Sequence, residues 1–156
     1  MKVLMVCLGN ICRSPLAEGV LKEKFKQHEI KGVVDSAGTA AYHAGEKPDP
    51  RSIDIAKKHG ININDQIARK FRVEDFDTFD KIFAMDSSNY NDIIKVARNK
   101  SDIDKVEMIL NQSNPGENLP VPDPYYGGKD GFENVYQMLD KACDTIVEKI
   151  QNGAKI

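Results

Sequence analysis

The sequence predicts an α/β protein, a single-domain three-layer fold in which helices flank a four-stranded parallel sheet. Two observations support this prediction. Short apolar stretches alternate along the chain with longer segments of helical periodicity, which is the pattern of βαβ units. The chain has 156 residues, a length that suits one domain, residues 1–156, with one hydrophobic core.

The first two elements are predicted from a buried strand followed directly by a helix start. Val3 to Val6 is a continuous apolar run, as expected of a strand that is buried on both faces. Ser14 and Pro15 then indicate the beginning of a helix, with Ser14 as the N-cap and Pro15 as the first helical residue. Apolar residues at helical spacing extend this helix to about His28.

The later elements continue the alternation and end in the clearest helix of the chain. An apolar stripe at i, i+3, i+4 spacing runs from Phe132 to Ile150 and includes Cys143. In a parallel sheet, ligands bind at the carboxyl ends of the strands, so the residues after Val6 are expected to carry the chemistry. The other expected elements are a strand at Val33–Val34, a helix from Pro50 to His59 ended by Gly60, a strand from Lys81 to Met85, a helix from Ser87 to Arg98 and a strand from Val106 to Leu110.

Composition and charge narrow the class of protein. The net charge is -2, so no general attraction to nucleic acid or to an anionic membrane is expected. The apolar run Val3 to Leu8 is too short for a signal peptide or a membrane span. Three cysteines, an odd number, do not indicate a secreted disulfide framework, and the histidines show no metal-ligand spacing with them. We therefore expect a cytoplasmic protein without a bound metal.

The loop after the first strand predicts a site for phosphate. Cys7 follows the strand, and Gly9 and Asn10 are the residue types that best tolerate positive φ in a tight anion-binding nest. Arg13 can bind two phosphate oxygens, and the helix N-terminus adds positive potential that favours the thiolate form of a cysteine. A cysteine at the end of a buried strand is often only a small hydrophobic residue. The combination with Arg13 and Ser14 at a strand-to-helix turn favours a phosphate-binding loop with a nucleophile.

Several segments together resemble one known family. Cys7 to Pro15 resembles the signature of the low-molecular-weight protein tyrosine phosphatases. Asp35 to Thr39, Phe76 to Asp80 and Asp123 to Gly127 resemble further segments of that family in the same order. The resemblance implies a protein-tyrosine-phosphatase that works through a cysteinyl-phosphate intermediate without a cofactor. It also implies phosphotyrosine-containing proteins as substrates, and inorganic phosphate or other oxyanions as inhibitors.

The resemblance assigns three catalytic residues. Cys7 would attack phosphorus, and Arg13 would hold the equatorial oxygens of the phosphoryl group. The leaving phenol has a pKa of about 10, so a general acid is required near neutral pH. Asp123 is the candidate, because Pro122 and Pro124 stiffen the chain on either side of it. After the phenol departs, the same carboxylate could activate water.

Further residues are expected to shape the site. The Ser14 hydroxyl could donate a hydrogen bond to the Cys7 thiolate and stabilise it as a leaving group. Family members often carry a histidine shortly before the pair that matches Ala68-Arg69, where it braces the loop asparagine, and here Gln66 is the candidate to replace it. Cys12 is either a passive hydrophobic residue or the partner of Cys7 in a reversible disulfide. The expected loop residues are Leu8, Gly9, Asn10, Ile11, Cys12, Ser14 and Ser36, and the expected substrate wall is formed by Tyr42, Tyr125 and Tyr126.

Three other functions fit the same kind of loop. An arsenate reductase would need further redox cysteines, and the segment from Ala84 to Ser88 has none. A catalytically inactive phosphotyrosine-binding module would not need Cys7, Arg13 and Asp123 together. A protein arginine phosphatase of the same family is implied to carry threonine at the position of Ile11, and an apolar branched residue suits a flat aromatic ring better than a guanidinium.

Overall fold

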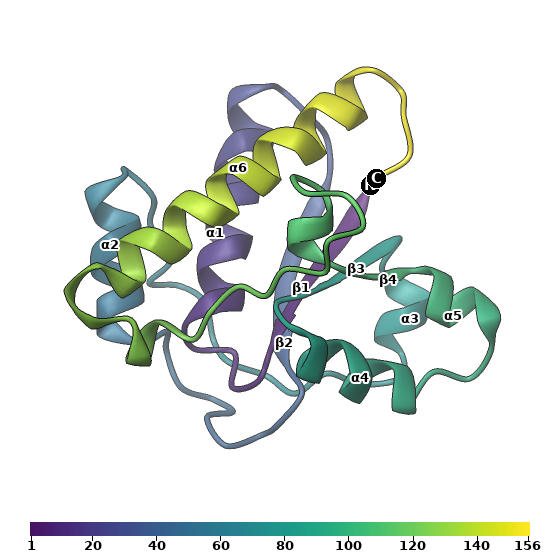
Figure 1. Ribbon diagram of the computed structural model, residues 1–156, viewed down its shortest axis with the longest axis horizontal. Coiled ribbons are helices and arrows are strands. Elements are labelled where there is room, and N and C mark those ends of the chain that lie inside the picture. The colour runs from purple at the N-terminus through teal and green to yellow at the C-terminus, as the bar shows by residue number, and fades with distance from the viewer.

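Four parallel strands form one sheet in the computed structural model, in the order β2-β1-β3-β4 (Figure 1). The structure describes the backbone of residues 1–156 and all side chains except those of Tyr126 and Lys129. Between β2 and β3 the chain crosses from one side of β1 to the other, so β1 ends at a topological switch point. The strands are β1 (Lys2–Cys7), β2 (Val33–Gly38), β3 (Lys81–Ala84) and β4 (Val106–Met108).

Helices cover both faces of this sheet, as the predicted three-layer fold requires. In Figure 1, α1, α2 and α6 lie on one side of the sheet, and α3, α4 and α5 lie on the other. The helices are α1 (Arg13–Gln27), α2 (Pro50–Lys58), α3 (Asp75–Thr78), α4 (Ser87–Lys95), α5 (Lys100–Asp104) and α6 (Gly131–Gln151), with short 3-10 turns at Ile109–Asn111, Pro124–Tyr126 and Gly128–Asp130.

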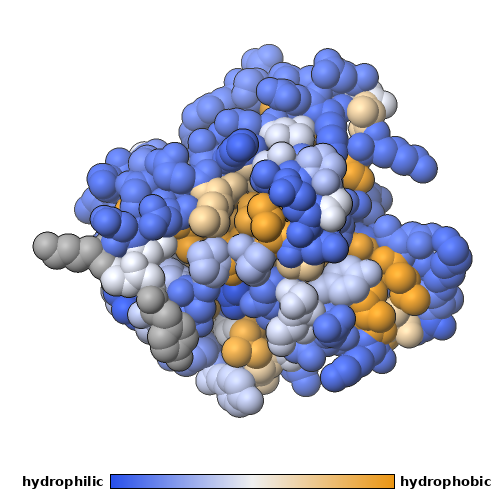
Figure 2. Space-filling view, viewed as in Figure 1, coloured by the Kyte–Doolittle hydropathy of each residue, from blue (hydrophilic) through white to orange (hydrophobic). Residues whose placement is uncertain are grey.

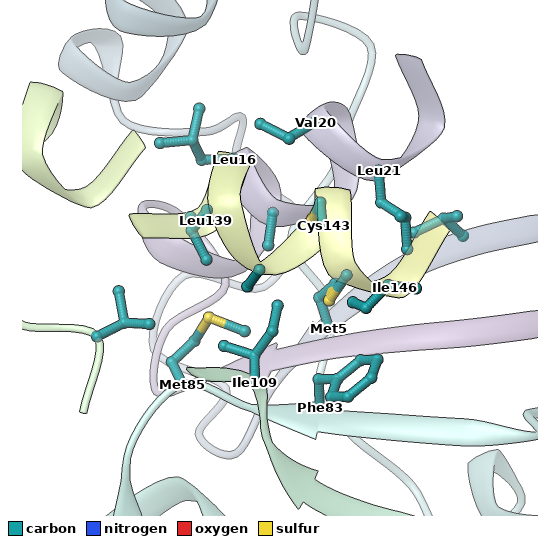
Figure 3. Packing of buried hydrophobic residues seen from close by; sticks show 14 of the residues in the cluster. Met5, Leu16, Val20, Leu21, Phe83, Met85, Ile109, Leu139, Cys143 and Ile146 are labelled. Atoms are coloured by element: carbon teal, nitrogen blue, oxygen red, sulfur yellow. The ribbon is translucent and has the colours of Figure 1, made fainter. Parts of the chain in front are cut away.

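The larger core lies between the sheet and the pair α1 and α6. Figure 3 shows Met5 of β1 and Phe83 of β3 facing side chains of α6, among them Leu139 and Ile146. Cys143 is fully buried in this core, as predicted from its place on the apolar stripe, and burial raises its pKa. This packing fixes α1, and with it the loop between β1 and α1, against the sheet.

The beginning of α1 differs from the prediction. The helix begins at Arg13, so Ser14 and Pro15 are its second and third residues and Ser14 is not the N-cap. Cys12 occupies the N-cap position without a side-chain capping bond. Proline is tolerated here because the first N–H groups of a helix have no partner within it. The Ser14 hydroxyl is therefore available for contacts in the preceding loop.

Other element boundaries also differ. β2 extends to Gly38, four residues beyond the predicted Val33–Val34, because the segment lies beside β1 and pairs with it despite its polar residues. β4 ends at Met108, where the chain turns into a 3-10 helix. α4 ends at Lys95, not at Arg98. The short helices α3 and α5 were not predicted, since 4 and 5 residues are too few to show a helical period.

The surface is largely polar. In the view of Figure 2, hydrophilic residues cover most of the molecule, and a group of hydrophobic residues lies over the region of α4 and α5. Val96 and Ile103 are exposed in that region. Among the residues described, no helix is both long and apolar enough to cross a membrane.

Candidate active site

The loop between β1 and α1 curls at the carboxyl end of the central strand. Asn10 has φ of 57°, in the left-handed region that asparagine tolerates better than most residues. Gly9 does not adopt a positive φ, so the prediction for Gly9 is wrong on this point. Its missing side chain has another use, because a Cβ at Gly9 would lie 3.1 Å from Cδ2 of His43. Gly9 thus makes room for a histidine from a distant turn.

The sulfur of Cys7 is surrounded by hydrogen-bond donors. The backbone N–H of Asn10 donates to Cys7 Sγ at 3.3 Å, and Sγ lies 3.0 Å from Ser14 Oγ. The N-terminus of α1 begins a few residues away and adds positive potential. These groups can hydrogen bond to the sulfur and stabilise negative charge that develops on it.

Asn10 connects the loop to two neighbouring segments. Its Nδ2 donates to Ser14 Oγ at 2.8 Å and to Ser36 Oγ at 2.9 Å, and its Oδ1 accepts from the backbone N–H of Arg69 at 3.0 Å. An amide nitrogen can only donate, so Ser14 accepts from Asn10 and has its own hydroxyl hydrogen left for Cys7. The expected loop residues Asn10, Ser14 and Ser36 therefore form one network behind the sulfur.

A buried glutamate ends this network and was missed by the sequence analysis. Ser36 Oγ donates to Glu18 Oε1 at 2.7 Å. Glu18 lies in α1, is buried and pairs with Lys22, and burial raises its pKa. The only signal in the sequence is a glutamate on the apolar face of a helix, between Ala17 and Gly19.

Gln66 does not replace the bracing histidine. Its Nε2 donates to the backbone oxygen of Pro15 at 3.0 Å, and its side chain forms no hydrogen bond with Asn10. Arg69 supports Asn10 instead, through its main chain, and its guanidinium is held by Asp35 and Asp75. Because the support comes from a backbone N–H, no side-chain pattern could have predicted it.

Arg13 is held in place by two groups that lie far from it in the sequence. Its Nη1 donates to Asp86 Oδ2 at 2.7 Å and to the backbone oxygen of Val121 at 2.9 Å. Among the described side chains and the backbone, its Nε and Nη2 have no hydrogen-bond partner and remain available to a ligand. Asp86 also caps α4, accepting from the N–H of Asn89 at 2.8 Å. The sequence analysis assigned Asp86 no role in the site.

The loop opens into a cavity of about 190 Å³ that brings the expected catalytic side chains together. Cys7, Arg13 and Asp123 all line it, although Asp123 is more than a hundred residues from the loop. The side chain of Tyr126 lies outside the described part of the structure. The described residues also show no group of three potential metal ligands. The full lining is Cys7, Leu8, Gly9, Ile11, Cys12, Arg13, Tyr42, His43, Asp123 and Tyr125.

The segment that carries Asp123 is fastened to the phosphate loop through Asp49. Asp123 Oδ1 accepts from the N–H of Tyr125 at 2.9 Å, and the Tyr125 hydroxyl donates to Asp49 Oδ2 at 2.7 Å. The N–H of Asp49 donates to the backbone oxygen of Ile11 at 2.7 Å. Arg51 stacks over the Tyr125 ring at 4.2 Å and also binds Asp49. The sequence analysis missed both Asp49 and Arg51.

These contacts change the acidity of the groups involved. Although burial opposes the change, hydrogen bonds from Arg51 and Tyr125 lower the pKa of Asp49. The hydrogen bond to Asp49 raises the pKa of Tyr125. Burial and the charge of Asp49 raise the pKa of Cys12 to about 12. Cys12 therefore stays a thiol near neutral pH.

Comparison with known proteins agrees with this geometry. The model of the family "low molecular weight phosphotyrosine protein phosphatase" matches residues 2–155. The chain belongs to this family. A member from Schizosaccharomyces pombe is 46% identical over 143 residues, covering 89% of this chain and 90% of the relative.

Two solved structures extend the comparison. A protein tyrosine phosphatase from Entamoeba histolytica has a TM-score of 0.91 at 38% identity, covering 100% of this chain and 99% of the other. A Drosophila arginine phosphatase has a TM-score of 0.89 at 32% identity, covering 97% of this chain and 98% of the other. The predicted fold and family are thereby confirmed, and the fold by itself does not separate the two kinds of phosphatase.

Proposed function

We propose that this chain hydrolyses phosphotyrosine in proteins, with Cys7 as the nucleophile. One observation carries the proposal: Cys7, Arg13 and Asp123 line the same small cavity, with Tyr42 and Tyr125 at its wall. This arrangement supports roles for these residues as nucleophile, anion-binding group, acid and aromatic wall around one substrate. Membership of the phosphatase family supports the same chemistry.

The phosphate loop holds the phosphoryl group throughout the reaction. Backbone N–H groups of the loop and the free Nε and Nη2 of Arg13 bind the equatorial oxygens. The positive charge comes from protein groups at fixed positions, which stabilises the charge that develops in the transition state. Inorganic phosphate and other oxyanions fit the same donors and are expected to compete with the substrate.

The reaction proceeds in two displacements at phosphorus. In the first, the Cys7 thiolate forms a P–S bond while the P–O bond to the tyrosine breaks, and Asp123 gives its proton to the leaving phenolate. In the second, the Asp123 carboxylate takes a proton from water as the water oxygen attacks phosphorus and the P–S bond breaks. The Ser14 hydroxyl stabilises the returning thiolate by donating a hydrogen bond to it.

The wall of the cavity favours an aromatic substrate. Ile11 and Tyr125 offer apolar surface to a flat ring, and Tyr42 is an exposed aromatic residue at the same opening. A guanidinium placed against Ile11 would lose hydration without gaining a partner. The similarity to the arginine phosphatase keeps phosphoarginine as the second candidate substrate.

The proposed setting is the cytoplasm. All three cysteines are unpaired, and a catalytic thiolate functions only where thiols stay reduced. Exposure to oxidants would instead inactivate Cys7, so the activity depends on a reducing environment.

Four substrates tested side by side check the proposal. Matched peptides with phosphotyrosine, phosphoserine or phosphoarginine are compared by kcat/KM, and arsenate reduction is measured with a thiol reductant. We expect phosphotyrosine to be hydrolysed best and arsenate not to be reduced. Ile11→Thr should shift the ratio toward phosphoarginine, whereas Ile67→Thr, at an exposed position outside the cavity, should leave it unchanged. Preference of the wild-type enzyme for phosphoarginine would overturn the tyrosine assignment.

A further inference from the structure

A histidine that has no part in the proposed chemistry lies at the rim of the cavity. His43 lines the cavity together with Cys7 and Asp123. Its Cδ2 and Nε2 edge packs against Gly9, at 3.1 Å and 3.9 Å from the position of a glycine Cβ. A Cβ at position 9 would be in tight contact with the ring, which would have to shift slightly to make room. The phosphate loop is thus shaped to accept this imidazole.

The other side of the ring is held by a carboxylate. His43 Nδ1 lies 2.7 Å from Glu46 Oε2, and the N–H of Glu46 donates to the backbone oxygen of His43 at 2.9 Å. The turn is tied to Ala68 by two backbone hydrogen bonds, one from the N–H of Gly45 and one to the oxygen of Glu46. Ala68 precedes Arg69, which supports Asn10. The position of His43 is therefore coupled to the loop that it borders.

This arrangement gives Nε2 two distinct states. A carboxylate only accepts, so Nδ1 carries a hydrogen toward Glu46 in either state of the ring. Nε2 is then a donor when the imidazole is protonated and an acceptor when it is neutral. The pair His43 and Glu46 is neutral overall in the first state and carries one negative charge in the second. Histidine is the side chain that makes this change between pH 5 and 8.

We propose that His43 and Glu46 form a substrate-recognition site that binds a carboxylate side chain next to the phosphotyrosine while His43 is protonated. The proposal rests on the proposed function, since it places the phosphotyrosine in the cavity that His43 borders. A carboxylate beside the phosphotyrosine accepts a hydrogen bond from Nε2 in the protonated state. When His43 loses its Nε2 proton, the substrate carboxylate faces the Nε2 lone pair and the negative charge of Glu46, and its binding is disfavoured.

Other charged groups face the same cavity and must be separated from His43. These groups change kcat/KM for every substrate. The ratio of kcat/KM between two peptides that share the phosphotyrosine therefore removes their effect. None of the described cavity-lining side chains forms a hydrogen bond with His43, whose ring bonds Glu46 instead. Glu46, from the same turn, contacts the ring from outside the cavity lining. The titratable or charged groups that line the cavity are Cys7, Cys12 and Arg13 from the loop and α1, and Tyr42, Asp123 and Tyr125 from the remaining wall.

The experiment measures kcat/KM for two peptides that differ only beside the phosphotyrosine, with aspartate on both sides in one and asparagine in the other. The aspartate-to-asparagine ratio is followed from about pH 5.5 to about pH 8, the interval in which histidine titrates. We expect the wild-type ratio to fall by about two- to fivefold as pH rises, the range of an exposed charge pair. In His43→Gln the ratio should be the same at both ends of the interval.

Two further variants give the test its controls. Glu46→Gln removes the negative charge behind the ring, so its ratio near pH 8 should exceed that of the wild type. His28→Gln alters a histidine at the far end of α1, beside Gln151, and should keep the wild-type fall. A constant wild-type ratio, or His43→Gln with the same fall as His28→Gln, would overturn the recognition site while leaving the hydrolase assignment intact. Failure to hydrolyse either peptide would instead overturn the proposed function together with this site.

Discussion

The sulfur of Cys7 lies 3.0 Å from the hydroxyl oxygen of Ser14, which itself accepts a hydrogen bond from Asn10 at 2.8 Å. The direction of that second bond leaves the hydroxyl hydrogen of Ser14 for the sulfur alone. A thiolate that leaves phosphorus regains its negative charge, and the Ser14 hydrogen bond stabilises that charge. The contact should therefore matter most when the phosphocysteine breaks down.

Replacing Ser14 with alanine should slow breakdown of the phosphocysteine more than its formation. A hydrogen bond to a charged group contributes about 1.5–3 kcal/mol, so we expect a loss of about 10- to 100-fold in the second step. Rapid-mixing kinetics with an aryl phosphate should show a burst of phenol release followed by slow turnover. Ser101→Ala, at an exposed position in α5, is the matched control. Equal slowing of both steps would show that Ser14 does not assist the leaving sulfur.

Cys7→Ser should abolish turnover and keep oxyanion binding. Serine preserves the shape of the site but is not ionised near neutral pH, and the N–H groups and Arg13 remain in place. Phosphate titration by calorimetry and thermal unfolding should match the wild type. A chelator should not affect the wild-type rate, because Arg13 and the loop supply the positive charge. Substantial turnover by Cys7→Ser would remove Cys7 from the mechanism.

Asp123→Ala should slow phosphotyrosine hydrolysis by about 10²- to 10⁴-fold, the usual effect of a positioned general acid. The loss should shrink for aryl phosphates whose phenols are already acidic, because these leave without a proton. The measurement is the single-turnover rate against the pKa of the leaving group, with Asp130→Ala as an exposed control from the same segment. A slope identical to that of the wild type would assign the acid to another group.

Oxidation should join Cys7 to Cys12. Peroxide converts the Cys7 thiolate to a sulfenic acid, and attack by Cys12 on that sulfur releases water and forms the disulfide. Mass mapping after peroxide treatment should find this bond, and a thiol reductant should restore activity. Cys12→Ser should be inactivated without full recovery, whereas Cys143→Ser should behave as the wild type. A mapped bond to Cys143 would assign Cys12 to packing alone.

The rate at which the Cys7–Cys12 disulfide forms should depend on Asp49. Burial and the charge of Asp49 raise the pKa of Cys12 to about 12, and the thiolate is the attacking form. Closure should therefore speed up as pH rises. Asp49→Asn removes one of the causes, lowers the pKa of Cys12 and should accelerate closure at a fixed neutral pH. The time course of disulfide formation, trapped by alkylation, gives the rate, and slower closure in Asp49→Asn would contradict the electrostatic explanation.

The fold was predictable because the apolar pattern of each long strand or helix can be recognised in the local sequence. The apolar run around Val3 and the stripe through Cys143 each report burial directly. Helices α3 and α5 are too short to do so, although Asn99 caps α5 by accepting a hydrogen bond from the N–H of Asp102. The start of α1 was misplaced because Ser14 has the usual identity of a cap but bonds inside the preceding loop.

The reacting groups of the site could be predicted from the sequence, whereas the residues that hold them in position could not. Cys7 and Arg13 share one loop, whereas the carboxylate that holds Arg13 is 73 residues away, at Asp86. Asn10 is supported by a main-chain group 59 residues away, which no side-chain pattern reports. His43 enters the cavity only because a turn folds over Gly9. Each of these contacts follows from tertiary packing.

The two hydrogen bonds on Nη1 of Arg13 also bear on the thermodynamics of ligand capture. They restrict the guanidinium in the ligand-free protein, so the loss of about 2 kcal/mol of arginine rotamer entropy is largely incurred during folding. Association with an oxyanion then requires no reorientation of this group, and its kinetics should be a single exponential phase without a slow isomerisation. The phosphate-binding site is therefore preorganised before phosphate binds.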